Sequence, residues 1–470
     1  MKLEIIFFKK VVVVVCFLWV FPFLAFSKDK MENPKNIVFI LVDDLGYSDI
    51  GYMKQKPQIK TPNIDKLAQN GMVFTNAYAS CPVCSPTRAS ILTGKYPATL
   101  HLTCHIPGIG MEKYVAQRSK GKKLLEADFI DHLPLEETTL AEVLKRNGYK
   151  TVFLGKWHLA GEGSQTTTDG VVNANYHPDQ QGFDINIGGC AYGQPASYFS
   201  PYRNATIADE AENEYLTDRL GEDACRFIEE NKKEKFLLYL SFYTVHTPWQ
   251  VPNDVVKKYN GNKYYAMIDQ LDENVGRVLN KLRELNLTKN TLIIFYSDNG
   301  GVQENPPLQD RKGSLYEGGI RVPLVFSLPG IVPENTTCEI PVTSPDFFPT
   351  LLAASGNFSE TGKYKVDGIN LWPVIIDGEK PDDRAIFWHF PHHRNNEKSM
   401  AAAVREGDWK LIYEFESQKL SLFNLKEDIG ETTNLSDKFP EKAKYLYEKL
   451  KNWQLDVNAV IPNPNPEFKN

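Results

Sequence analysis

Hydrophobic residues form continuous runs at several places along the chain, and these runs predict strands. The runs occupy residues 37–42, 150–154, 236–243, 291–296 and 324–327. Polar residues rarely interrupt them, which is typical of strands whose two faces are both buried in a parallel sheet. We therefore predict that these runs form the centre of a buried, mostly parallel sheet.

A second pattern, with apolar residues every three or four positions, predicts helices between these runs. It is clearest at residues 264–285. The apolar stripe there consists of Ile268, Leu271, Val275, Val278 and Leu282. Further helices are predicted at residues 62–70, 140–147 and 213–232. The predicted strands and helices therefore alternate through this part of the chain.

The pattern changes at about residue 385. Short predicted strands at residues 385–390, 401–405, 409–414 and 421–424 are joined by tight loops, and a final helix is predicted at 441–457. This order predicts a small antiparallel sheet covered by one helix. A polar segment with Gly and Pro at 377–383 precedes it, so we place one domain at 28–380 and a C-terminal subdomain at 381–470.

The N-terminal residues 1–27 have the pattern of a secretory signal peptide. Lysines precede an apolar run at 11–26, and Ala25 and Ser27 provide small residues for cleavage. We expect the mature protein in the periplasm or outside the cell. The alternative is an uncleaved N-terminal anchor. No other stretch predicts a membrane span, so stable membrane insertion of the mature chain is not expected.

The net charge limits the kinds of ligand that are expected, and the cysteine content limits the disulfides. The formal net charge of −6 argues against nucleic acid as a partner, although local basic groups can still bind sulfate. Removal of the signal leaves six of the seven cysteines, in a compartment that permits disulfides. The pairing is left open among Cys81, Cys104, Cys190, Cys225 and Cys338.

Residues 80–94 predict a tight loop that enters a helix. Pro86 suits the first helical turn, and Gly94 suits the end of the helix. Arg88 lies four residues after Cys84, so both side chains share one face. A helix N-terminus beside an arginine binds anions. The segment therefore predicts either a reactive Cys84 facing an anion site or a buried structural cysteine on a capped helix.

Polar residues follow the ends of the predicted strands, where open α/β sheets bind their ligands. The residues in question are Asp43, Asp44, Lys156, His158, His246, Asp298, Asn299 and, in a later loop, Lys312. Adjacent carboxylates such as Asp43 and Asp44 repel each other, so a cation is their natural partner. Alone, Asp43 and Asp44 are also compatible with a solvated turn or a helix cap, and Lys156 and His158 with a strand-end lysine and a core histidine.

These motifs together resemble the type I, formylglycine-dependent sulfatases. The run from Cys84 to Arg88 contains the complete C-x-P-x-R pattern, followed by Leu92-Thr93-Gly94, and Lys156-x-His158 matches a second motif. The resemblance covers residues 36 to about 435. It implies an alkaline phosphatase-like α/β sandwich around a large mixed, mostly parallel sheet, with a smaller C-terminal α+β subdomain consisting of an antiparallel sheet and a helix.

The resemblance also implies a cofactor and a partner. A formylglycine-generating or other sulfatase-maturation enzyme would convert Cys84 to 3-oxoalanine (formylglycine), whose hydrate is the nucleophile. A divalent cation, Ca²⁺ with Mg²⁺ as the alternative, suits an all-oxygen ligand set. The implied ligands are Asp43, Asp44, Asp298, Asn299 and the converted Cys84.

The remaining residues receive catalytic roles by the same resemblance. Arg88 would hold the hydrate. The residues implied to bind sulfate oxygens are Lys156, His246 and Lys312. His246, with or without Lys312, would protonate the leaving alcohol, and His158 would take a proton to expel sulfate. The opposite assignment of the two histidines stays open.

The expected substrate is a sulfated carbohydrate. The pattern at residues 106–108 and 405–410 resembles bacterial enzymes that desulfate polysaccharides such as ulvan, carrageenan or glycosaminoglycans. A phosphonate or phosphate ester hydrolase of the same superfamily and a non-catalytic glycan-binding protein are the alternatives. His105, in a predicted surface loop at 101–131, and the basic loop 391–394 are either solvated or in contact with the substrate.

Overall fold

The computed structural model describes residues 34–161, 174–394 and 400–469. The predicted signal peptide at 1–27 lies outside the described residues.

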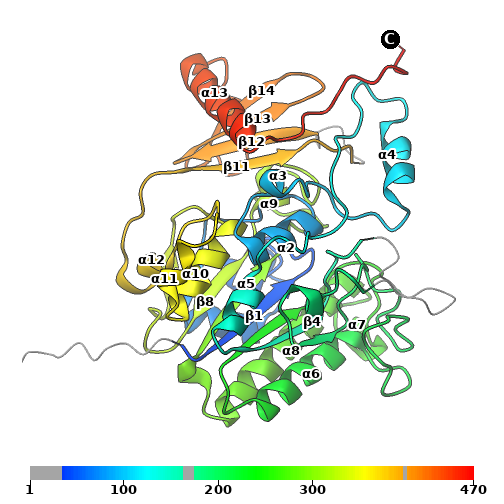
Figure 1. Cartoon of the computed structure of the whole chain (residues 1–470), viewed down its shortest axis with the longest axis vertical. Helices are drawn as coiled ribbons and strands as arrows, with labels where there is room; N and C mark the ends of the chain where they lie inside the picture. The colour runs from blue at the N-terminus through cyan, green and yellow to red at the C-terminus, as the bar shows by residue number, and fades with distance from the viewer. Residues whose placement is uncertain (1–33, 162–173, 395–399, 470) are drawn as a thin grey trace, which may run out of the picture. The chain divides into compact units, whose positions relative to one another are not determined.

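An eight-stranded sheet forms the centre of the described chain, in the order β5-β4-β6-β1-β7-β8-β2-β9 (Figure 1). Its strands are β1 (Asn36–Val42), β2 (Met72–Phe74), β4 (Lys150–Gly155), β5 (Ile185–Ile187), β6 (Phe236–Ser241), β7 (Thr291–Ser297), β8 (Leu324–Ser327) and β9 (Thr336–Cys338). The pairs from β5 to β7 are parallel, β8 is antiparallel to both of its neighbours, and β2 is parallel to β9. The prediction of a mixed, mostly parallel sheet is confirmed.

Helices cover both faces of this sheet, which explains why its central strands are mainly apolar. All seven residues of β1 are buried; Phe39 faces one hydrophobic cluster and Ile40 the other. The first cluster includes side chains of α2 (Cys84–Thr93), α5 (Leu140–Arg146) and α10 (Phe347–Ala354). The second includes side chains of α1 (Pro62–Gln69), α6 (Leu216–Glu230) and α8 (Lys263–Glu284). The sheet is thus the middle layer of three.

A second, four-stranded antiparallel sheet follows, as the sequence predicts. It runs in the order β11 (Ala385–Phe390), β12 (Ala401–Glu406), β13 (Trp409–Glu414) and β14 (Leu420–Asn424), and α13 (Pro440–Asp456) packs on one face. Its other face packs against the first part of the chain, where the Trp388 indole donates a hydrogen bond of 2.8 Å to the Ala79 carbonyl. The domain boundary near residue 380 stays a prediction.

A buried ionic network also connects the two parts. Lys410 on β13 lies 2.8 Å from both Glu317 Oε1 and Glu431 Oε1, and all three side chains are buried. Glu317 begins α9 (Glu317–Ile320) and also binds Arg321 at 3.0 Å and the Tyr78 hydroxyl at 2.7 Å. The C-terminal sheet therefore supplies charge compensation to the first part of the chain.

Three predicted segments differ from the structure. The apolar residues between 73 and 78 predict one short strand. In the structure a turn interrupts it, and the chain continues as β3 (Ala77–Tyr78), which pairs with β10 (Val342–Thr343) in a separate sheet. The predicted surface loop at 101–131 contains α4 (Met111–Ser119). This helix has only a weak pattern of apolar residues, and of its side chains only Tyr114 and Ser119 are buried. Residues 161–211 are rich in Gly, Thr and Asn, which predicts a loop. Part of this segment lies outside the described residues, and the rest contains β5 at the sheet edge.

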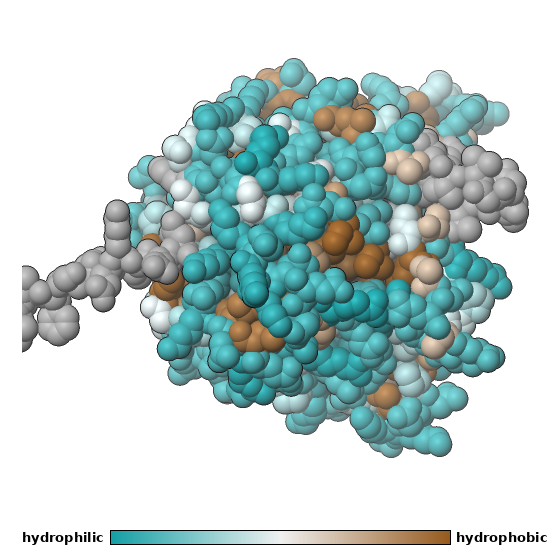
Figure 2. All heavy atoms as spheres, turned by 60° about the horizontal axis from the view of Figure 1, so that its bottom comes forward, coloured by the Kyte–Doolittle hydropathy of each residue, from teal (hydrophilic) through white to brown (hydrophobic). Residues whose placement is uncertain are grey.

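Short helices complete the described chain. They are η1 (Gly51–Met53), α3 (Pro97–Leu100), η2 (Pro178–Gln181), α7 (Asn253–Lys258), η3 (Thr288–Asn290), η4 (Ser344–Asp346), α11 (Phe358–Thr361) and α12 (Trp372–Asp377). The face shown in Figure 2 is mainly hydrophilic, with small separate groups of apolar side chains. Within the described ranges, none of the helices combines the length and apolarity needed to cross a membrane. The cysteines of these ranges, from Cys81 to Cys338, are all free thiols.

Candidate active site

The acidic residues of the site lie together because β1 and β7 are neighbours in register. Val42 is paired with Ser297, so Asp43 and Asp44 leave the sheet beside Asp298 and Asn299. The Asn299 amide donates a hydrogen bond of 2.8 Å to Asp44 Oδ1, and the Asp44 backbone N–H donates one of 3.3 Å to Asp298 Oδ1. Asp44 has a left-handed backbone with φ of 63°, which turns the chain at this point.

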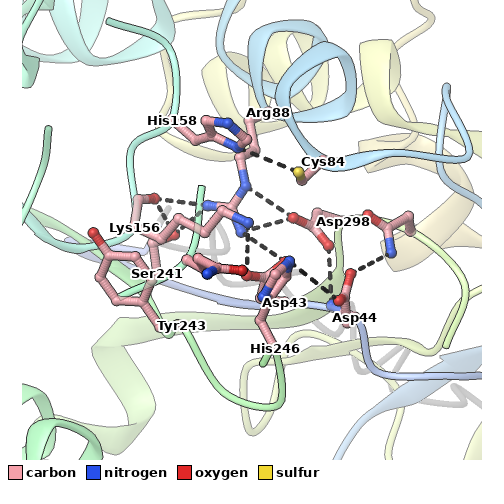
Figure 3. A network of polar contacts seen from close by, with 12 residues as sticks. Asp43, Asp44, Cys84, Arg88, Lys156, His158, Ser241, Tyr243, His246 and Asp298 are labelled. Carbon is pink, nitrogen blue, oxygen red and sulfur yellow. Dashed lines mark hydrogen bonds and ion pairs between the residues drawn. The ribbon is translucent and has the colours of Figure 1, made fainter. Parts of the chain in front are cut away.

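Each buried carboxylate of this cluster contacts at least one cationic side chain, and Figure 3 shows Asp43 and Asp298 beside Lys156 and Arg88. Arg88 binds Asp298 Oδ2 through Nε at 2.8 Å and Nη2 at 2.7 Å. Lys156 Nζ lies 2.6 Å from Asp43 Oδ2, and Lys312 Nζ contacts Asp44 Oδ1. The three carboxylates therefore lie among three cations from separate segments of the chain.

Burial and neighbouring charges shift the pKa values of these carboxyl groups in different directions. Burial raises the pKa of Asp43 to about 6, although Lys156 opposes the shift. Burial also acts to raise the pKa of Asp44, but Lys312 and then His246 hold that pKa below its usual range. Burial and then Asp43 raise the pKa of Asp298. Additional positive charge beside these carboxylates would favour their ionised forms.

The cluster also fits a divalent cation by its geometry. Ligand atoms of Asp43, Cys84 and Asp298 lie within 4.8 Å of one another, and all three residues are buried. Asp43 Oδ1 and Asn299 Oδ1 are buried and have no hydrogen-bond partner within the described residues. Buried oxygens without donors are unfavourable, and carboxylate and amide oxygens are the ligands that Ca²⁺ and Mg²⁺ prefer. The residues present therefore suit such an ion.

Cys84 is the first residue of α2, a helix whose ten residues are all buried. Gly94 ends the helix with a φ of 72°, as the sequence predicts. The Cys84 Sγ lies 3.3 Å from His158 Nδ1 (Figure 3). Burial acts to raise the pKa of the Cys84 thiol, but Lys156 and Lys312 lower it below its ordinary value. Cys84 therefore lies at a helix N-terminus in a cationic environment.

The tautomer of His158 follows from its two contacts. Nε2 lies 2.9 Å from the Ile106 carbonyl, which can only accept, so Nε2 carries the proton. Burial, with the Lys156 charge, holds the pKa of His158 well below its ordinary value. The imidazole is therefore neutral, and Nδ1 presents a lone pair to Cys84.

The backbone around His158 differs from its prediction. An extended segment after β4 would point Lys156 and His158 the same way, which is the sequence-based prediction. Both side chains do point into the site, but His158 has a φ of 56° and the segment is not fully extended. A Cβ at Gly193 would lie 2.5 Å from the His158 ring, so the Gly193 backbone packs directly against it. Sequence reasoning missed Gly193, because nothing in its neighbourhood indicates which side chain it meets.

His246 follows β6 and lies at the edge of the cluster. Its Nδ1 lies 2.8 Å from the Thr247 carbonyl and therefore carries the proton, and Nε2 lies 3.6 Å from Asp44 Oδ2. Burial lowers the pKa of His246 to about 4, although Asp44 opposes the shift. The imidazole thus presents Nε2 toward Asp44.

These residues open onto a cavity of about 500 Å³. Four of the predicted site residues line it: Cys84, His158, His246 and Lys312. The others lie beneath its wall. The rest of the wall consists of Val83, His105, Ile106, Gly108, residues 191–196 and Arg394. The structure therefore brings every predicted site residue to one place.

Two predicted loops take definite positions around this cavity. His105 lines the wall and is half-buried. In the loop 391–394, His392 and His393 are buried, and His392 Nδ1 binds Glu126 Oε2 at 2.8 Å. Only Arg394 of this loop reaches the cavity. The view of this loop as simple surface charge is therefore wrong.

Comparisons with known proteins agree with this arrangement. The family model described as "Sulfatase" matches residues 35–357, and that described as "N-sulphoglucosamine sulphohydrolase, C-terminal" matches residues 309–457. A protein named "Sulfatase" from Formosa agariphila is 32% identical over 519 residues, covering 93% of this chain and 92% of its own length. N-acetylgalactosamine-6-sulfatase from Homo sapiens is 28% identical over 387 residues, covering 76% of this chain and 68% of its own.

A solved structure has the same fold over most of the chain. The crystal structure of Ps i-CgsB in complex with k-i-k-neocarrahexaose is 30% identical, with a TM-score of 0.76, and covers 93% of this chain and 95% of that one. The match of the sulfatase family model spans well over half of the residues. The chain therefore belongs to the sulfatase family and is a sulfuric ester hydrolase.

Proposed function

We propose that this sulfatase hydrolyses sulfate esters of a sulfated carbohydrate, using the side chain of Cys84 after its conversion to 3-oxoalanine. One observation carries the proposal. The Cys84 Sγ lines the cavity, 3.3 Å from a neutral histidine nitrogen and within 4.8 Å of carboxylate oxygens of Asp43 and Asp298. A reactive atom, a base and a cation site thus meet at one point of the cavity.

The relatives support a carbohydrate substrate. The similar crystal structure is a complex with a neocarrahexaose, and the similar human protein is named as a sulfatase of N-acetylgalactosamine. For this chain we propose a sulfated polysaccharide or oligosaccharide, such as ulvan, carrageenan or a glycosaminoglycan. The cationic wall of the cavity suits such an anionic ligand.

The oxygen cluster would hold the divalent cation. Its proposed ligands are Asp43, Asp44, Asp298, Asn299 and the converted side chain at position 84. When bound, Ca²⁺, or Mg²⁺ as the alternative, would neutralise sulfate charge and lower the pKa of the attacking oxygen. Arg88 keeps Asp298 in place for this task through its two contacts at 2.8 and 2.7 Å.

Proton movement is assigned to the chain's own side chains. The Nδ1 lone pair of His158 faces residue 84 and is placed to take a proton from its side chain. Lys312 and His246 line the cavity, where they would bind sulfate oxygens, with Lys156 behind them on Asp43. His246, with or without Lys312, would protonate the leaving alcohol. For this role Nε2 of His246 would first take up a proton, which the negative charge of a bound sulfate would favour. Exchange of roles between the two histidines is the alternative.

Export and maturation complete the proposal. We propose that residues 1–27 direct the chain to the periplasm or to the outside of the cell, where sulfated polysaccharides are found. A sulfatase-maturation enzyme would act on Cys84 before the chain folds, because Cys84 is 3% exposed in the folded structure.

Replacing Cys84 tests the mechanism. We expect Cys84→Ala to lower sulfate release from a panel of sulfated oligosaccharides by more than about 10³-fold, because the nucleophile is lost. A mass spectrum of the peptide covering residues 80–95 should show the converted side chain in the wild type.

Cys338→Ala, at a half-buried cysteine on β9, is the matched control and should keep its activity. Undiminished sulfate release by Cys84→Ala would contradict the mechanism. Faster turnover of phosphate than of sulfate esters by the wild type would favour the phosphate ester alternative.

A further inference from the structure

The wall of the active-site cavity contains a cation that the proposed mechanism does not use. Arg394 follows β11 and lines the same cavity as Cys84 and Lys312. The charged side chains that line the wall, apart from the histidines, are Lys312 and Arg394, and within the described ranges no carboxylate lines it. A concave surface of this kind attracts anionic groups.

Arg394 lies next to the part of the wall that would bind the reacting sulfate. A Cβ at Gly313 would lie 3.1 Å from Arg394 Nε, so the arginine packs on the backbone of the residue that follows Lys312. The Gly313 N–H donates a hydrogen bond of 2.9 Å to the Pro82 carbonyl, in the segment that leads to Cys84. Arg394 is thus supported on backbone that is itself tied to the nucleophile segment.

His105 contributes to the orientation of the guanidinium group. Arg394 Nη1 donates to His105 Nδ1 at 3.4 Å. Burial, and then the Arg394 charge, hold the pKa of His105 well below its ordinary value, so the imidazole is neutral. This contact therefore directs the guanidinium without adding negative charge.

We propose that Arg394 binds a second sulfate, on the sugar next to the one whose ester is hydrolysed. This inference rests on the proposed function, because it assumes that a sulfated glycan occupies the cavity. A guanidinium forms two parallel hydrogen bonds with an oxyanion, which an ammonium group cannot reproduce. The enzyme therefore selects glycans that carry sulfates on neighbouring sugars over glycans with a single sulfate.

The test compares two disaccharides that share a backbone from which the wild type releases sulfate. One carries a single sulfate ester, and the other carries a second sulfate on the neighbouring sugar. In Arg394→Ala and Arg394→Gln we expect kcat/KM for the doubly sulfated disaccharide to fall roughly tenfold to a hundredfold, mainly through KM. For the singly sulfated disaccharide we expect a change of no more than about twofold. Arg394→Lys should lie between the wild type and Arg394→Ala.

Arg311→Ala is the matched control, because Arg311 immediately precedes Lys312, is exposed and lines a different hollow. It removes the same charge and should leave the preference unchanged. Equal losses on both disaccharides, no loss on either, or the same loss in Arg311→Ala would overturn the proposal. Thermal melting of each variant shows whether it has folded.

Failure of the proposed function gives a different result. If the wild type releases sulfate from no disaccharide of the panel, the proposed function is contradicted. Calorimetric affinities of the wild type and Arg394→Gln for the same panel then test Arg394 alone. Weaker binding of the doubly sulfated members to Arg394→Gln supports the second sulfate site, and equal affinities overturn it.

Discussion

Arg88 combines electrostatic and geometric roles within one side chain. Its Nη1 donates to the Lys156 carbonyl and to Ser241 Oγ, both at 2.7 Å, while Nε and Nη2 hold Asp298. The side chain is 2% exposed. The planar guanidinium group therefore joins α2 to the ends of β4, β6 and β7. Its loss should affect stability as well as turnover.

We expect Arg88→Ala to lower the free energy of unfolding by about 3–5 kcal/mol, because it leaves Asp298 buried without its cationic partner. Arg88→Lys keeps the charge but not the guanidinium group, so it should recover only part of the loss. Denaturant unfolding measures both variants. Lys232→Ala, which breaks the exposed pair with Glu229, should change stability by no more than about 1 kcal/mol. A similar value for Arg88→Ala would contradict this role.

At this scale, sequence reasoning found the residues that interrupt a clear pattern. Asp43 and Asp298 were identifiable because they follow apolar runs directly. Cys84 was identifiable because it begins the C-x-P-x-R motif. Gly193 was missed and Arg394 was left open between solvent and substrate contact, because their positions depend on contacts with His158 and Gly313 that are distant in sequence. Local patterns do not encode such contacts.

The pairing of β1 with β7 has a consequence for stability. Their register places three carboxylates and an amide at one edge of the sheet, where a divalent cation would connect the two strand ends. Such an ion stabilises only the folded chain, because the unfolded chain does not assemble the ligands.

We expect Ca²⁺ added to the chelator-treated enzyme to raise its melting temperature. At about 100 times the Kd, the gain in the free energy of unfolding should be about 3 kcal/mol. Asn299→Ala removes one oxygen ligand and should weaken this gain. Asn147→Ala, at the end of α5, is the control and should show the full gain. An equal gain in wild type and Asn299→Ala, or none in the wild type, would contradict the assignment.

Sequence patterns predicted the elements with strong periodicity well. The strands β1, β4, β6 and β7, the helix α8 and the four C-terminal strands lie within a few residues of their predicted positions. The helix α4 was missed because its side chains are mostly exposed or half-buried, which leaves no apolar stripe. The strand β5 was missed because its three residues are only half-buried at the sheet edge. Such elements form through contacts with other parts of the fold, which the local sequence pattern does not show.

For the whole molecule, the buried network around Lys410 predicts a pH dependence. Burial raises the pKa of Glu431 to about 7, although Lys410 opposes the shift. Burial also acts to raise the pKa of Glu317, but Lys410 and Arg321 lower it to about 2. Between about pH 5 and 8, Glu431 therefore titrates in the folded chain while Glu317 stays ionised.

We expect the folded wild type to lose stability through Glu431 as the pH rises through this range. The folded chain binds a proton that the unfolded chain releases near pH 4.5, so this contribution decreases as Glu431 ionises near pH 7. The decrease should be up to about 3 kcal/mol, and Glu431→Gln should abolish it. Denaturant unfolding from pH 5 to 8 measures the difference. Glu427→Gln, at an exposed neighbour, is the control; equal slopes in the wild type and Glu431→Gln would contradict the prediction.

The same network limits how hybrid enzymes can be made. Lys410 and Glu431 belong to the C-terminal segment that also supplies Arg394, whereas Glu317 belongs to the loop that carries Lys312. A hybrid that takes this C-terminal segment from a relative, in order to accept another glycan, would leave Glu317 with Arg321 but without its second cationic partner, unless the donor also provides a lysine in place of Lys410. Exchange of this segment should therefore succeed only between proteins that have the same residues at the positions of Glu317, Lys410 and Glu431.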